Sequence, residues 1–90
     1  MNTPKPYNEK RNGNIIYRNF SQDIDESELI WHMDKEDRYV KVLNESDWGF
    51  QMDNELPIKI EKGNVIEIPP YQYHRIIKGK GDLVVRIWEF

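Results

Sequence analysis

The stretch from Gly63 to Arg75, which reads GNVIEIPPYQYHR, constrains the fold more than any other part of the chain. Its apolar run VIEI is rich in β-branched residues and lies between Gly63 and the pair Pro69-Pro70, which is typical of a strand. Because proline has no N–H to donate to a sheet, two consecutive prolines predict a rigid corner. We expect a second strand to begin at His74, so that the corner fixes the backbone position of this histidine.

The rest of the chain also favours β-structure. From Arg38 onward apolar and polar residues alternate in short segments, and turn-forming residues separate these segments. A helix over residues 22–36 competes with a strand over residues 27–33, but the apolar residues drift from helical spacing and no Gly or Pro closes the segment. The expected strands are residues 15–20, 27–33, 39–43, 48–52, 56–60, 64–68, 74–78 and 83–88. This succession predicts an all-β, antiparallel sandwich or barrel.

The chain of 90 residues is short enough to form one domain, in which folding buries about 60–70% of the surface of the unfolded chain. Residues 1–14 are polar and contain two prolines and the turn signal Asn12-Gly13, so we expect an N-terminal arm that is ordered only where it packs on the domain. Residues 15–90 are expected to form a single β-barrel domain.

Composition and charge argue against several classes of function. The net charge is −3 and the pI is about 5.3, and the basic residues are scattered among acidic ones, so we expect no nucleic-acid partner. Without cysteine, the chain has no disulfides and no thiolate metal ligands, and the cytoplasm is the expected location. No apolar run has the length of a membrane span, so we expect no membrane partner.

Three residues of the central stretch resemble the second sequence motif of the cupin superfamily. That motif runs glycine, five residues, proline, one residue, glycine, two residues, histidine, and Gly63, Pro69 and His74 match it at the same spacing. Tyr71 stands where the motif has its inner glycine. The resemblance implies a fold of the double-stranded β-helix (jelly-roll) type, an antiparallel barrel.

The first cupin motif survives in part in the segment IWHMDKEDRYVKVLNE. His32 fits its second histidine, and Ile30 stands where its first histidine would be. Together the two motifs make the resemblance extend over residues 27–90. Within the superfamily, the run IPPYQYHR looks like the corresponding corner of 3-hydroxyanthranilate dioxygenases, in which two histidines and a glutamate hold a non-haem iron. By this resemblance His32 and His74 correspond to the two histidines.

The position of the family's glutamate has two possible registers in this chain. Counted by spacing from His32, either Asp37 or Arg38 falls there. Strand alternation favours the register with Arg38, because Arg38 shares a face with Val40 and Val42. In the other register Asp37 is the carboxylate ligand.

The resemblance implies a divalent metal, Fe, Mn, Ni or Zn. Two imidazoles and one carboxylate form the facial triad of non-haem Fe(II) oxygenases, which leaves metal positions open for substrate and oxygen. His32 and His74 would supply the imidazoles, and Asp34 or Asp37 the carboxylate. Gln51 could supply an oxygen, and it is a catalytic candidate together with Arg38.

Arg38 has two interpretations. As a functional residue, its guanidinium would offer a fork of donors to a substrate carboxylate or phosphate. As a structural residue, it would pair with Asp34, Glu36 or Asp37 at the end of a hairpin.

Two classes of function follow from these observations. The first is a metal-dependent enzyme of the dioxygenase, isomerase or lyase type that acts on a small polar or anionic molecule. The second is a metal-free cupin that binds or senses a small molecule, or one of the sugar-epimerase type with histidine as general base. In either class we expect a homodimer, because five Tyr, three Trp and three Phe exceed what a small barrel interior holds and open sheet edges need covering.

Overall fold

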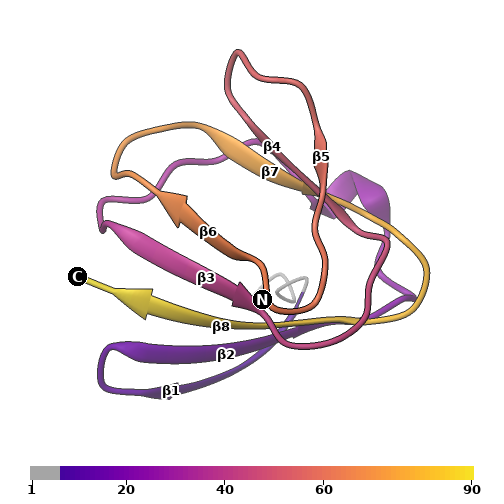
Figure 1. Ribbon diagram of the computed structural model, residues 1–90, viewed down its shortest axis with the longest axis horizontal. Helices are drawn as coiled ribbons and strands as arrows, with labels where there is room; N and C mark the ends of the chain where they lie inside the picture. The colour runs from indigo at the N-terminus through magenta and orange to yellow at the C-terminus, as the bar shows by residue number, and fades with distance from the viewer. Residues whose placement is uncertain (1–6) are drawn as a thin grey trace, which may run out of the picture.

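The computed structural model describes residues 7–90 and places them in two antiparallel sheets that face each other (Figure 1). The larger sheet has five strands in the order β1-β2-β8-β3-β6, and the smaller has three in the order β5-β4-β7. In chain order the elements are β1 (Asn8–Asn12), β2 (Ile15–Phe20), the short 3₁₀ helix η1 (Glu26–Glu28), β3 (Arg38–Val42), β4 (Gly49–Met52), β5 (Ile58–Lys59), β6 (Val65–Ile68), β7 (His74–Ile77) and β8 (Leu83–Glu89). This confirms the predicted all-β, antiparallel fold class.

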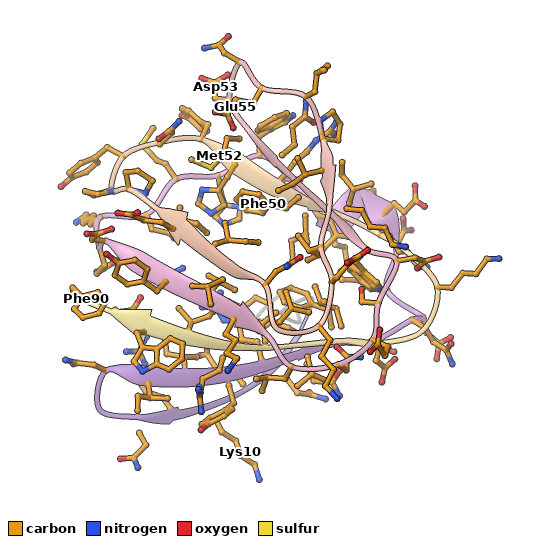
Figure 2. All side chains as sticks on the ribbon, in the orientation of Figure 1. Lys10, Phe50, Met52, Asp53, Glu55 and Phe90 are labelled. Carbon is orange, nitrogen blue, oxygen red and sulfur yellow. The ribbon has the colours of Figure 1, made fainter. Side chains whose placement is uncertain are left out.

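Strand alternation builds the core between the two sheets. On β8, Leu83, Val85 and Ile87 are buried while the residues between them are only partly buried. Ile16 and Phe20 continue the same apolar layer on the neighbouring strand β2. The small sheet contributes Phe50, whose side chain points toward the larger sheet in Figure 2. Side chains that alternate in this way bury one face of each sheet, which is what stabilises a two-layer β fold.

Trp48 illustrates how the largest core side chain is accommodated. It is fully buried and packs against Phe20 at a ring-centroid distance of 6.1 Å. Its indole Nε1–H donates a hydrogen bond of 3.0 Å to the carbonyl oxygen of Gly81. The single polar atom of the side chain therefore keeps a partner inside the protein.

The segment expected to be an N-terminal arm is a strand in the part that the structure describes. β1 pairs with β2 from Asn8↔Asn19 to Asn12↔Ile15, and Gly13 takes a φ of +61° in the turn between them. The two turn residues are Gly13 and Asn14, and the glycine supplies the left-handed backbone that the first position of such a turn requires. Residues 1–6 of the predicted arm lie outside the described residues.

The expected strand over residues 27–33 is wrong, and the competing helix over residues 22–36 is not present either. The carboxylate of Asp25 accepts the N–H of Ser27 at 3.0 Å and caps the 3₁₀ turn η1. Short polar side chains of this kind compete with a sheet for backbone donors. Only His32 keeps a strand-like pairing, an isolated bridge to His74 with backbone N–H···O distances of 3.0 and 2.9 Å.

Two further features agree with the local sequence. The expected strand over residues 56–60 shortens to Ile58–Lys59, next to Pro57, which has no N–H for pairing. Gly63 and Tyr71 both have positive φ values, +88° and +60°, so Tyr71, which stands where the cupin motif has its inner glycine, has a backbone conformation that favours glycine. Among the described residues, no helix has the length and apolar character needed to cross a membrane.

Candidate metal centre

Three side chains from two separate segments of the chain meet close together. His74 is the first residue of β7, while His32 and Asp34 come from the segment between η1 and β3. One candidate ligand atom from each of the three lies within 4.8 Å of the others. The bridge between His32 and His74 brings their rings to a centroid distance of 4.3 Å. Residues two apart in an extended segment share a side, so Asp34 joins His32.

Hydrogen bonds to backbone carbonyls orient both imidazoles. His32 Nδ1 lies 3.1 Å from the carbonyl oxygen of Ile30, and His74 Nδ1 lies 3.0 Å from that of Gln72. A carbonyl oxygen only accepts, so Nδ1 is the donor in each of these hydrogen bonds, and a ring in its neutral form then has its lone pair on Nε2. Bonds of this kind fix the tautomer and the ring direction in histidines that bind metals.

His74 is the more deeply placed of the two histidines. It is 4% exposed, and its ring stacks on Phe50 at a centroid distance of 5.8 Å. The pKa of His32 lies below its ordinary value, chiefly because burial disfavours the imidazolium and in part because His74 and Arg38 add positive charge nearby. A neutral imidazole is the form that coordinates a metal.

Asp34 supplies the carboxylate of the group. Its Oδ2 lies 3.4 Å from His74 Nε2 and 3.0 Å from Arg38 Nη1, yet this buried oxygen makes no well-directed hydrogen bond. The contact with His74 and, less strongly, the charge of Arg38 hold the pKa of Asp34 below its ordinary value, against the opposing effect of burial. The carboxylate is therefore ionised at neutral pH, and its buried Oδ2 lies next to His74 without a well-directed hydrogen bond.

Arg38 connects the group to the C-terminal strand. It is 8% exposed and opens β3 directly opposite Glu89 of β8. Its Nη1 faces Asp34, while Nε donates to Glu89 Oε2 at 2.8 Å and Nη2 contacts the same oxygen. The other oxygen of Glu89 lies 2.8 Å from Arg11 Nη1. Asp34, Arg38, Glu89 and Arg11 thus form a row of alternating charges, which we call the charge ladder.

A cavity of about 350 Å³ lies beside the three side chains. His32, Asp34, Arg38 and His74 all line it, together with many apolar side chains that include Phe50. A volume of this size is within the usual range for sites that bind small molecules.

The structure brings together four of the six predicted site residues. His32, Asp34 and His74 form the group, and Arg38 points inward as strand alternation predicts, beside Asp34 as its structural interpretation proposed. Asp37 does not join the group and does not line the cavity, and its backbone oxygen accepts the N–H of Phe90 at 2.9 Å.

The placement of Gln51 needs a correction. It follows Phe50 on β4, so its side chain lies on the opposite face of the strand and does not line the cavity. There Gln51 Oε1 accepts from Arg75 Nε at 3.0 Å, and Nε2 donates to the carbonyl oxygen of Glu55 at 2.9 Å. These two hydrogen bonds hold the Gln51 side chain away from the cavity.

Sequence reasoning missed two charged residues near the site. Glu89 continues the inward alternation of Leu83, Val85 and Ile87, and this pattern could have identified it as an inward-facing carboxylate. Arg18 lies between the buried residues Ile16 and Phe20 of β2 and lines the cavity, a position that the same pattern could also have identified.

Similarity to other proteins is found in the structure. A scan against protein-family models and a search of curated proteins found no match. An RmlC-like cupin with a double-stranded β-helix fold from Methanocaldococcus jannaschii superimposes with a TM-score of 0.74 at 10% identity, over 99% of this chain and 84% of that chain. A cupin-like protein from Thermotoga maritima gives a TM-score of 0.64 at 20% identity, over 82% of this chain and 54% of that chain.

The Fe(II) form of HppE in complex with substrate gives a TM-score of 0.70 at 11% identity. The match covers 100% of this chain and 56% of HppE, so this chain spans little more than half of that protein. At such identities the similarity concerns the fold. This chain has the antiparallel double-stranded β-helix fold of cupins, with a His–Asp–His group beside its cavity that could bind a metal ion.

Proposed function

We propose that this protein is a small metal-binding cupin that holds one divalent ion through His32, Asp34 and His74 and binds a small molecule in the adjoining cavity. The observation that carries this proposal is the convergence of three candidate ligand atoms within 4.8 Å. Two imidazoles and one carboxylate are the donor set of a facial triad, which leaves positions on the metal for other ligands. When bound, the ion would supply Lewis acidity or, if it is iron, redox chemistry.

The residues of the chain fit such an ion. Both histidines have Nδ1 bound to a carbonyl oxygen, so each can offer Nε2. The buried oxygen of Asp34 has no well-directed hydrogen bond and would gain a partner. Arg38 Nη1 lies 3.0 Å from the same oxygen, and this ion pair positions the carboxylate. Phe50 covers one face of the His74 ring and limits access of water to it.

Iron is the first ion to test. The donor set matches that of non-haem Fe(II) sites, and the run IPPYQYHR resembles 3-hydroxyanthranilate dioxygenases. HppE, which shares the fold, was solved in its Fe(II) form with substrate. An enzyme of the dioxygenase, isomerase or lyase type is compatible with this site, and the substrate would enter the same cavity.

The ion pair between Asp34 and Arg38 favours a second candidate function. Asp34 already lies 3.0 Å from a guanidinium and 3.4 Å from His74, so the group is compensated in charge without an ion. In a metal-free cupin of the binding or epimerase type, the ring of His74 would bind the ligand or accept a proton from it, with Asp34 beside it.

The experiment that separates these candidates is elemental analysis of protein purified without a histidine tag. Metal-free protein is then titrated with Fe(II), Mn, Ni and Zn, and we expect about one ion per chain, as for a single facial triad. His74→Ala and Asp34→Asn should lose the ion. Asp37→Asn is the matched control, because Asp37 lies outside the group, and it should bind like the unaltered protein.

The outcome that contradicts the metal site is equally clear. If unaltered protein and Asp34→Asn both take up no ion in stoichiometric amount, the metal-free function replaces it. If Asp37→Asn loses the ion while Asp34→Asn retains it, the carboxylate ligand has been assigned to the wrong residue.

A further inference from the structure

Most of the side chains that line the cavity are apolar. They come from strands of both sheets and include Val40, Ile66, Phe50, Ile76 and Val85. The charged or titratable side chains that line it are Tyr7, Arg18, Glu28, His32, Asp34, Arg38 and His74. A polyol such as a sugar would leave most of its hydroxyl groups without partners against such walls, and each unpaired group in an apolar site costs binding energy.

Arg38 has little left to offer to an anionic ligand. Nη1 is committed to Asp34, and Nε and Nη2 are committed to Glu89. An anion that used its remaining N–H groups would lie next to these two carboxylates, whose side chains are only 17% and 11% exposed. Like charges that are poorly solvated repel each other, so such an anion would bind weakly.

Arg18, the other cavity-lining cation, is also paired with a carboxylate. Its Nε lies 2.7 Å from Glu9 Oε1, and its guanidinium covers the ring of Tyr7 at 4.2 Å. The strand register separates Arg18 from Arg38. Arg18 on β2 lies opposite Val85 on β8, and Val85 lies opposite Val42 on β3. Val42 is four positions along β3 from Arg38. At about 3.3 Å per residue the two arginines are offset by roughly 13 Å along the strands. The apolar walls therefore lie between two paired cations.

We propose that this cavity takes a neutral, largely apolar molecule with one polar group that reaches the His32, Asp34 and His74 group. This inference deepens the proposed function and rests on it, because it names the class of molecule that the same site receives. Glu28, an acidic residue with an exposed side chain on the cavity lining, further disfavours anions. The volume of about 350 Å³ fits a ligand of roughly ten to fifteen non-hydrogen atoms.

The probes are 1-butanol, 1-hexanol and 1-octanol, compared with the carboxylates and the primary amines of the same chain lengths. Binding is measured by calorimetry to the full chain, once metal-free and once loaded with Fe(II) or Zn. Each added methylene should tighten alcohol binding by roughly three- to fourfold until the cavity is full. At equal length the alcohol should bind better than the carboxylate and the amine, in both forms of the protein.

Ile76→Phe reduces the cavity, because Ile76 lines it. The matched control is Ile77→Phe, the same substitution at the next position of β7, which does not line the cavity. Ile76→Phe should weaken 1-octanol binding by at least about tenfold, while Ile77→Phe should leave it nearly unchanged. If either variant fails to fold, the chain-length series on the unaltered protein decides the question alone.

The outcomes separate this inference from the metal site. A chain-length dependence in protein that binds no metal supports the apolar cavity and rejects the proposed metal function. The inference is overturned if the protein takes up metal but its affinity for the alcohols does not change with chain length. It is also overturned if carboxylates or amines bind more tightly than the alcohols. In both cases the metal site stands.

Discussion

Replacing Arg38 by methionine tests whether the charge ladder holds the site together. Methionine keeps most of the length of the arginine side chain and removes its charge and all its donors. Arg38 is 8% exposed, and its two carboxylate partners, Asp34 and Glu89, are 17% and 11% exposed in their side chains. The substitution therefore leaves two poorly solvated negative charges with one fewer cation.

The structure gives the size of the expected effect. Removing one partner of a buried ion pair costs about 3–5 kcal/mol. Glu89 keeps its contact of 2.8 Å with Arg11, so only Asp34 loses its guanidinium partner completely. We therefore expect a loss near the lower limit, about 3 kcal/mol, in the free energy of unfolding of the metal-free protein. In a domain of this size that corresponds to a decrease of about 12–24 °C in Tm.

Urea denaturation at pH 7 measures the change, with Lys41→Met as the matched control. Lys41 lies on the same strand but on the face opposite to Val40 and Val42, so its replacement should change stability by no more than about 0.5 kcal/mol. Arg38→Met combined with Asp34→Asn should recover part of the loss, because the uncompensated carboxylate is removed. A loss below about 1 kcal/mol for Arg38→Met, or no recovery in the double variant, would refute the role of the ladder.

The remaining predictions concern pH, the backbone and the oligomeric state. The pKa of His32 is lowered in the folded state, so the unfolded chain binds more protons and the stability of metal-free protein should fall as the pH decreases from about 6.5. Urea denaturation at several pH values measures this loss of stability, which should be absent in His32→Asn. Tyr71→Gly should stabilise the protein by up to about 1 kcal/mol in urea denaturation, since Tyr71 has a φ of +60° and an exposed side chain, whereas Tyr71→Ala should give no gain. We predict a homodimer by light scattering, and Ile58→Lys on the edge strand β5 should give a monomer, because this exposed apolar side chain lies where a second copy could cover the edge.

Much of the fold was predictable because strand alternation reports directly on burial. The residues Leu83, Val85 and Ile87 alternate in the sequence and are all buried in the structure. The segment over residues 27–33 failed because its outcome depends on a local competition: the side chain of Asp25 binds a backbone N–H that a strand would need. Residue preferences alone do not reveal whether the N–H of Ser27 binds the side chain of Asp25 or a carbonyl oxygen of a neighbouring strand.

Site residues on strands were predictable, because alternation along a strand tells which side chains point inward. Site residues in the loop before β3 were less predictable. Alternation correctly placed Arg38 inside, and the same reasoning would have placed Gln51 outside, because Phe50 before it points inward. The pairing of His32 with His74 is different. It depends on an isolated bridge between a loop and β7, which no local pattern in the sequence specifies.

Neither of the two positions considered for the cupin glutamate supplies the carboxylate of the His32, Asp34 and His74 group. Arg38 takes the inward position on β3, yet a carboxylate reaches the two histidines from Asp34, four residues earlier in the loop. The ion pair of 3.0 Å between Asp34 and Arg38 connects these two positions. An inward arginine therefore does not remove the carboxylate from the site, because it holds in place one that the loop supplies. The consequence is that the loop bearing His32 and Asp34, rather than the strand β3, positions two of the three candidate ligands, so its bridge to His74 sets the geometry of the whole group.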